Sequence, residues 1–222
     1  MKNVIDQLVA EMDEETRRLG SDEILYLVGH PISRYMKGAA GRADKLGLLT
    51  MFVHPAVKIR GFCVYDTETT EGPYNVRPLH DLDAISTPEM SCTAEAIALL
   101  LCQQYGLLRG KHICIVGRGH AVQGLAEFLL MNDCTVTLCH SKTEDLLRAS
   151  YGSDILVLAA PIPAGVPVGV VGMDLVLDVS GARGPVADYI REEGSTYVSA
   201  QDIGRLNISV LLNRFVKRSK EA

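Results

Sequence analysis

The segment at residues 111–143 constrains the fold of this chain more than any other part. It predicts a buried strand at residues 113–116, a glycine-rich turn, a helix at about residues 122–131 and a second buried strand at residues 135–139. A turn in this position lies at the carboxyl end of the first strand, where ligands collect in parallel sheets. The segment therefore predicts a strand–turn–helix–strand unit whose turn can hold a pyrophosphate.

The glycines of the turn have distinct expected roles. Gly117 permits a tight turn, Gly119 lets the backbone approach a phosphate, and the helix behind them offers N–H groups and a positive dipole end. Gly124 comes later than the third glycine of the usual fingerprint. We predict a dinucleotide site here, and a βαβ turn without a ligand is the alternative. The candidate residues are Gly117, Arg118, Gly119, His120 and Val122.

The end of the second strand bears on the choice of cofactor. In NAD-specific folds an acidic residue usually ends this strand and binds the ribose 2′-hydroxyl. Residues 138–143 contain no carboxylate. Hydroxyls and cations favour a 2′-phosphate, so we predict NADP, with NAD as the second choice. The candidate residues are His140, Ser141 and Thr143, with Arg118 and Lys142 as cations that could alternatively be solvated loop charges.

Hydrophobic spacing and capping residues predict a small N-terminal β/α lobe. Gly20 is expected to end its first helix, and Ser33 and Gly47 to cap the second. A polar, turn-rich loop is expected at residues 66–78. The elements predicted before it are a helix at about 3–19, a strand at 24–28, a helix at about 33–46, and strands at 48–53 and 61–65.

The rest of the chain predicts a second, Rossmann-like lobe. Nearly continuous apolar strands that alternate with helices indicate a parallel sheet covered on both faces. Ala160, Pro161 and Asp178 follow or end two of these strands and are further cofactor-binding candidates, although Asp178 could equally cap the following turn. Pro163 and Pro167 continue a rigid loop. The elements predicted are a connecting helix at 93–105, strands at 155–159, 175–179 and near 197–198, and a helix at about 206–217.

The predicted fold class is therefore α/β in two lobes with a cleft between them. The domain boundaries that we predict are residues 1–92 for an N-terminal substrate or catalytic lobe, 93–205 for the NAD(P)-binding lobe with its connecting helix, and 206–222 for a C-terminal helix.

Composition excludes several other classes of protein. A net charge of −5 argues against a nucleic-acid or anionic-membrane surface, and no apolar run has the length of a membrane span.

The six cysteines lack Cys-x-x-Cys spacing, which indicates small hydrophobic residues in a reducing cytoplasm. The six histidines lack metal-ligand spacing, so no metal is expected. The C-terminal basic residues Arg214, Lys217, Arg218 and Lys220 are expected to be solvated.

Several blocks, in order, resemble the bifunctional methylenetetrahydrofolate dehydrogenase/cyclohydrolase family. The nucleotide half carries the more specific likeness, because residues 117–122 resemble the family's Gly-Arg-Ser-x-x-Val and residues 135–143 nearly repeat its second-strand motif. The other blocks are residues 28–35 (Val-Gly…Ser-x-x-Tyr), 80–84 (Lys-Asp-Val-Asp-Gly), 91–94 (Pro-Cys-Thr-Pro), 178–179 and a helix start at Gly204.

This resemblance implies hydride transfer from the methylene bridge of tetrahydrofolate to NADP, then hydrolysis of the methenyl product. It also implies a homodimer and a final helix that crosses back to the first lobe. Asp83 matches a carboxylate that contacts the pterin ring, although an Asx-turn or helix-capping role is an equal alternative. Tyr35 matches the family's catalytic tyrosine, and a half-buried helix tyrosine is its alternative.

The catalytic pair of the family is incomplete in this chain. Its lysine stands four residues after the tyrosine, where this sequence has Ala39. Lys37 is only two residues from Tyr35 and points to another side of the helix. The glycine-proline loop before the last helix is also replaced, at residues 199–207. Cyclohydrolase activity is therefore expected to be lost.

Three functions remain open on the sequence. The first is an NADP-dependent dehydrogenase that acts on methylenetetrahydrofolate or a close relative. The second is an NAD(P)-dependent oxidoreductase for a non-folate imine or amine metabolite, since the departures from the family fall on the substrate side. The third is a non-catalytic nucleotide-binding homologue.

Overall fold

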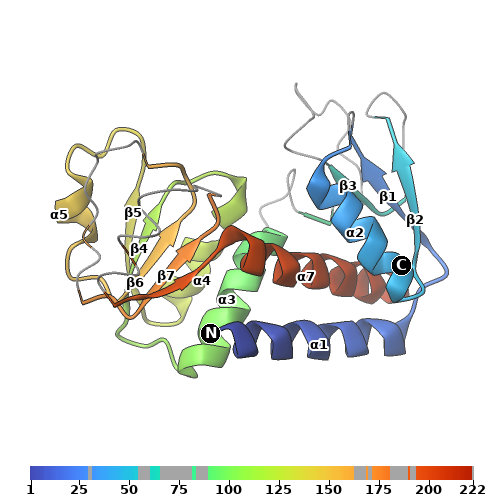
Figure 1. Ribbon diagram of the computed structural model, residues 1–222, viewed down its shortest axis with the longest axis horizontal. Helices are drawn as coiled ribbons and strands as arrows, with labels where there is room; N and C mark the ends of the chain where they lie inside the picture. Colours follow the sequence, from blue (N-terminus) through green and yellow to red (C-terminus); the bar gives the residue numbers. More distant parts are fainter. Residues whose placement is uncertain are drawn as a thin grey trace.

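Two separate parallel sheets divide the molecule into two lobes, as the sequence predicts (Figure 1). The computed structural model describes residues 1–29, 32–54, 61–65, 82–83, 90–162, 169, 172–180, 190 and 194–221. The predicted loop at residues 66–78 and the prolines Pro163 and Pro167 lie outside these residues.

The N-terminal lobe contains a three-stranded sheet in the order β2-β1-β3. Its strands are β1 (Ile24–Val28), β2 (Leu49–Val53) and β3 (Cys63–Tyr65), and all of them are parallel. Helix α2 (Arg34–Lys45) begins where predicted, because Ser33 Oγ accepts the Met36 N–H at 3.3 Å. Helix α1 (Lys2–Leu19) ends at Gly20, whose φ is 58°.

The second lobe contains a five-stranded parallel sheet in the order β5-β4-β6-β7-β8. Because β5 and β6 lie on opposite sides of β4, the chain reverses direction across the sheet there. Such a switch point opens a crevice at the carboxyl ends of the strands. The strands are β4 (His112–Val116), β5 (Thr135–Cys139), β6 (Ile155–Leu158), β7 (Leu175–Asp178) and β8 (Thr196–Val198).

Strand β5 is not the buried strand that the sequence predicts. It lies at the edge of the sheet, and the Leu138 side chain is 46% exposed. The central strands β6 and β7 are buried at every position. An edge strand has a neighbour on one side only, and a run of apolar residues does not reveal which strand takes that place.

Long helices run between the lobes and join them (Figure 1). Helix α3 (Cys92–Tyr105) packs against α7 (Ala200–Glu221), which in turn packs along α1. Phe215 of α7 meets Phe62 of the first lobe edge to face, with ring centroids 5.6 Å apart. The final helix begins at Ala200 rather than near residue 206, so Gly204 lies inside it and does not mark its start.

The helix predicted at residues 122–131 is broken in two. A 3₁₀ turn, η1 (His120–Val122), is followed by α4 (Leu125–Met131), and Gly124 between them has φ 79°. A Cβ at Gly124 would lie 2.9 Å from Met90 Cα, so this glycine allows the turn to pack closely against the start of α3. The short helix α5 (Leu146–Ser150), capped by Asp145, was not predicted.

The cysteines of the described residues behave as buried apolar side chains. Burial raises the pKa of the Cys92 thiol well above its usual value. Burial, together with Cys139 whose Sγ lies 3.8 Å away, raises the pKa of Cys114 to about 12. Cys102 is only half-buried. A thiol reacts through its thiolate, so these side chains differ in their expected reactivity.

We expect iodoacetamide to alkylate Cys102 well before Cys92 or Cys114 in the folded protein at neutral pH. Peptide mass spectrometry at increasing reaction times measures the order of modification. Labelling of Cys92 or Cys114 at the rate of Cys102 would contradict their burial, and unfolding in guanidinium should make all three react alike.

Within the part of the chain that the structure describes, no helix is long and apolar enough to cross a membrane. In the same residues, no three histidine, cysteine or acidic side chains gather in a group that could hold a metal ion.

Candidate functional site

A cavity of about 510 Å³ opens at the carboxyl ends of β4, β5 and β6. This is the switch point of the sheet, where the sequence places the nucleotide. Among its lining residues are seven predicted cofactor contacts and four others that were not predicted. The predicted ones are Gly117, Arg118, His140, Ser141, Thr143, Ala160 and Pro161; the others are Val116, Glu144, Leu146 and Ile162.

Gly117 lines this cavity and has no room for a side chain. Its φ is 109°, and a Cβ there would lie 2.9 Å from both the Ala159 carbonyl carbon and Ala160 Cβ. Its N–H donates to the Cys139 carbonyl oxygen at 2.9 Å, which ties the turn to β5. Gly119 differs, because a Cβ added there would meet no heavy atom within 4 Å. The backbone at Gly119 is therefore open to an approaching ligand.

The turn at residues 140–143 is held by its own hydrogen bonds. The His140 N–H donates to Thr143 Oγ1 at 3.0 Å, and the Thr143 N–H donates to the His140 carbonyl at 2.8 Å. The Lys142 N–H donates to His140 Nδ1 at 3.1 Å, so a neutral His140 carries its proton on Nε2. The turn therefore offers an imidazole N–H and two hydroxyls to a ligand without further folding.

A second cavity, of about 340 Å³, lies beside the glycine turn and α4. It is lined by the three predicted residues of this turn that the first cavity lacks, Gly119, His120 and Val122. Arg118 lines both cavities. The glycine turn therefore borders both cavities, and Arg118 is shared between them.

Asp178 lines neither cavity. Its Oδ1 accepts the N–H and hydroxyl of Ser180 at 2.9 and 2.7 Å, and its Oδ2 accepts the Tyr197 hydroxyl at 2.8 Å. Asp178 is 2% exposed. Its contacts with Ser180 cap the turn after β7, and its contact with Tyr197 links β7 to β8. The turn-capping alternative for Asp178 is therefore present in the structure, and its contact with a cofactor stays a prediction.

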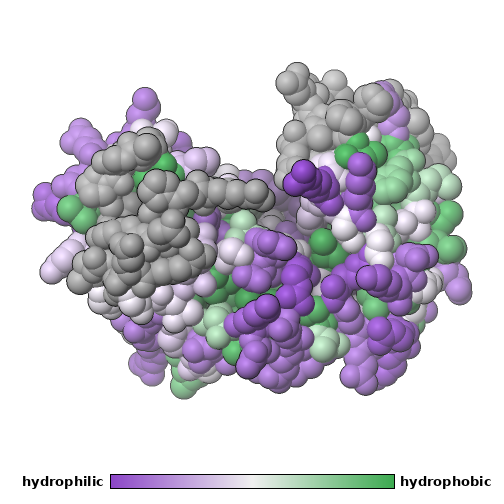
Figure 2. Space-filling view, viewed as in Figure 1, coloured by the Kyte–Doolittle hydropathy of each residue, from purple (hydrophilic) through white to green (hydrophobic). Residues whose placement is uncertain are grey.

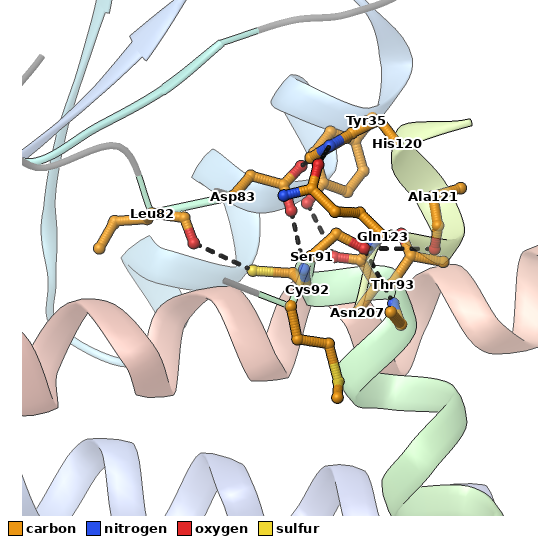
Figure 3. Close-up of polar contacts among 12 residues, drawn as sticks. Tyr35, Leu82, Asp83, Ser91, Cys92, Thr93, His120, Ala121, Gln123 and Asn207 are labelled. Carbon is orange, nitrogen blue, oxygen red and sulfur yellow. Dashed lines mark hydrogen bonds and ion pairs between the residues drawn. The ribbon is translucent and has the colours of Figure 1, made fainter. Parts of the chain in front are cut away.

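Asp83 and His120 meet at the junction of the lobes (Figure 3). Asp83 Oδ1 accepts the Cys92 N–H at 2.8 Å, at the start of α3, and Oδ2 lies 3.1 Å from His120 Nε2. His120 Nδ1 is 3.2 Å from Gln123 Oε1. The capping role named as an alternative for Asp83 is therefore present. The same carboxylate also connects the first lobe to the glycine turn of the second.

Tyr35 is held by a residue that sequence reasoning missed. Its hydroxyl donates to Asn207 Oδ1 at 2.9 Å, and Asn207 Nδ2 donates to Thr93 Oγ1 at 2.6 Å. The chain of contacts joins α2, α7 and α3 (Figure 3). Position 39, where the family has its lysine, is a fully buried alanine, and Lys37 is exposed. A polar side chain within the largely apolar stretch of the last helix was the available signal for Asn207.

Arg214 is not the solvated cation that the sequence predicts. Its side chain is 13% exposed and donates to the carbonyls of Leu82 and Met90 at 2.8 and 3.0 Å, and it forms an ion pair with Glu95. Lys217, by contrast, is half exposed and pairs with Glu15 on the surface. Arg214 therefore anchors the segment that carries Asp83 to α7 and α3.

On the face shown in Figure 2, the molecule is hollowed between the lobes. The fold and these contacts define a class: a two-lobed α/β protein with a Rossmann-type nucleotide-binding lobe and a polar network at the lobe junction. The family described as tetrahydrofolate dehydrogenase/cyclohydrolase, NAD(P)-binding domain, matches residues 91–220, more than half of the chain. The chain belongs to this family, which confirms the resemblance predicted from the motifs.

Relatives of this chain carry the name bifunctional protein FolD. The protein from Thermosipho melanesiensis is 29% identical over 184 residues, which are 76% of this chain and 66% of the relative. The protein from Caldanaerobacter subterraneus subsp. tengcongensis is 37% identical over 109 residues, 44% of this chain and 36% of the relative. The matched part of the chain thus spans less than two thirds of either relative's length.

A solved structure is similar over nearly the whole chain. It is the FolD methylenetetrahydrofolate dehydrogenase/cyclohydrolase from Campylobacter jejuni, with a TM-score of 0.74 at 21% identity, covering 99% of this chain and 97% of that one. This likeness confirms the two-lobed α/β fold.

Proposed function

We propose that this protein is an NADP-dependent dehydrogenase that acts on 5,10-methylenetetrahydrofolate or a close relative, without cyclohydrolase activity. The observation that carries the proposal is the cavity at the carboxyl ends of β4, β5 and β6, where the Gly117 turn meets the donor-rich turn at residues 140–143. Membership of the family of NAD(P)-binding domains supports the same assignment.

The residues of the chain fit the nucleotide by position and chemistry. The open backbone at Gly119 suits a pyrophosphate, and Arg118, His140, Ser141 and Thr143 supply donors suited to a 2′-phosphate. The bound nicotinamide would accept the hydride that leaves the methylene carbon, and the folate product would be the methenyl cation. The contribution of the protein is then to orient the two reactants and to exclude water.

The junction of the lobes is the proposed folate side. Asp83 is the candidate for the aminopyrimidinone edge of the pterin, and Tyr35 flanks it. Both Asp83 oxygens already accept or pair within the protein, so a pterin would take over the contact with His120. Hydrolysis of the methenyl product requires a group that handles a proton beside the attacking water. Ala39 is buried and stands where the family has its lysine, which supports the loss of cyclohydrolase activity.

The test combines binding with turnover in the purified protein. Thermal unfolding is measured with NADP, with NAD, and with each plus a tetrahydrofolate analogue, and reduction of NADP is followed with methylenetetrahydrofolate. We expect stabilisation by NADP, a further rise with the folate, and formation of NADPH. Stabilisation by nucleotide without folate effect or turnover would refute the folate part. No effect from any ligand would refute the nucleotide part as well.

A second candidate is an NAD(P)-dependent oxidoreductase for a smaller imine or amine metabolite. It is favoured by the early start of α7 at Ala200, since helix replaces the loop expected before residue 206. Ser199 caps this helix and its hydroxyl donates to Asp202 Oδ2 at 2.7 Å. Reduction of the nucleotide by a small amine, with none by the folate, would select this candidate.

We also propose a homodimer in the reducing cytoplasm. The cysteines of the described residues are thiols, which agrees with such a compartment. For the dimer, α4 and the edge strand β5 contact each other and expose Leu130, Met131 and Leu138, which are 59%, 86% and 46% exposed. An apolar surface beside an unpaired strand edge suits a second copy of the chain.

The dimer proposal predicts that Met131→Asp shifts the protein to monomers, because a carboxylate would be buried without a partner. Sedimentation velocity at several protein concentrations measures the mass. Leu49→Asp, which charges an exposed leucine of β2 in the other lobe, is the matched control and should leave the mass unchanged. A monomeric parent protein, or a dimer that survives Met131→Asp, would refute this surface.

A further inference from the structure

Glu144 lies in the lining of the larger cavity, together with Arg118 and the turn at residues 140–143. The sequence favours NADP because residues 138–143 contain no carboxylate. The next residue supplies one. Since the turn is closed by hydrogen bonds between His140 and Thr143, the chain doubles back and brings position 144 to the same cavity as the end of β5.

The flanking residues fix where Glu144 stands. On one side is the closed turn, and on the other is Asp145, whose Oδ1 accepts the Arg148 N–H at 2.8 Å and caps α5. Asp145 is therefore occupied as a helix cap and does not line the cavity. Glu144 is exposed at the mouth of the cavity. Its carboxylate is thus available to a ligand bound against Arg118 and His140.

The charges around the cavity are balanced rather than cationic. Of the two cations that the sequence associates with a 2′-phosphate, Arg118 lines the cavity and Lys142 does not. Glu144 adds one negative charge to the same lining. A carboxylate accepts hydrogen bonds from the ribose hydroxyls of NAD, as the acidic residue of NAD-specific folds does, and it repels the dianionic 2′-phosphate of NADP.

We propose that Glu144 determines nucleotide specificity and lets this site accept NAD alongside NADP. Arg118 and the hydroxyls of the turn bind the 2′-phosphate of NADP. Glu144 accepts hydrogen bonds from the ribose hydroxyls of NAD and weakens the binding of NADP. This inference rests on the proposed nucleotide site. It adds the identity of the residue that sets the preference between NAD and NADP.

The test is the ratio of the dissociation constants of NAD and NADP, measured by isothermal titration calorimetry, with no turnover needed. Glu144→Gln keeps the size of the side chain and removes its charge. We expect tighter NADP binding, weaker NAD binding, and a combined change in the ratio of about tenfold in favour of NADP. Because the repulsion is electrostatic at an exposed position, the gain for NADP should shrink at high salt.

Two further variants make the result specific. Glu14→Gln removes the same charge from an exposed position on α1 and should leave the ratio unchanged. Arg118→Gln should move the ratio in the opposite direction, towards NAD. An unchanged ratio in Glu144→Gln, or equal shifts for both nucleotides, would overturn the specificity role and leave the nucleotide site intact. Absence of binding of either nucleotide to the parent protein would overturn both proposals.

Discussion

Replacing Gly117 by alanine is expected to abolish nucleotide binding and to destabilise the second lobe. The backbone at this position has a φ of 109°, which side-chain-bearing residues rarely adopt, and the new Cβ would lie 2.9 Å from the Ala159 backbone and from Ala160 Cβ. The neighbours are strand-end backbone that cannot move aside easily. Strain and overpacking together should lower the free energy of unfolding by about 2–4 kcal/mol.

The binding defect should exceed what lower stability alone produces. Relief of the clash should push the turn away from β6, and this turn lines the cavity. Calorimetry with NADP at a temperature where the variant remains folded separates the two effects, and we expect affinity to fall at least about a hundredfold. Gly119→Ala is the control for stability, since its Cβ would enter open space. Gly117→Ala with normal NADP affinity would contradict the assignment of this turn.

Replacing Arg214 by methionine is expected to be the most destabilising change of a charged residue at the lobe junction. Methionine keeps much of the volume but leaves the carbonyls of Leu82 and Met90 without this donor and leaves Glu95 without its cation. Removing one partner of a buried pair is costly, although Glu95 is partly exposed, so we expect a loss of about 2–3 kcal/mol.

Chemical denaturation followed by circular dichroism measures this loss. Lys220→Met removes the same charge from an exposed position of the same helix and should change stability by less than about 0.5 kcal/mol. The Arg214 variant should also lose order around Asp83, which hydrogen exchange at the amide of Cys92 reports, since that amide donates to Asp83. Equal stabilities for the two variants would show that Arg214 is solvated, as the sequence alone predicts.

Local patterns in the sequence were sufficient for most elements of the fold. The apolar runs at β4, β6 and β7 predict strands because a central parallel strand is buried on both faces. Ser33 and Gly20 predict helix ends because a cap satisfies groups within a few residues of itself. These signals depend on neighbours along the chain, so the printed sequence contains them in full.

The features that the sequence predicted wrongly depend on contacts between residues that are far apart in the chain. The break in the helix after the glycine turn exists because Gly124 packs against Met90, more than thirty residues earlier in the chain. Arg214 is buried because the segments at Leu82 and Met90 return to α7. No spacing rule within one helix distinguishes such a cation from a solvated one, because its partners come from other elements.

The candidate site divides in the same way. By itself the sequence determined that a glycine turn follows a buried strand, and that residues 140–143 offer donors to a nucleotide, because both features are local. Only the tertiary structure decided that Glu144 joins the same cavity, that Asp178 caps a turn, and that Asp83 reaches His120 across the lobes. Proximity between side chains of different elements follows from the packing of the whole chain, and packing is a property that no single segment carries.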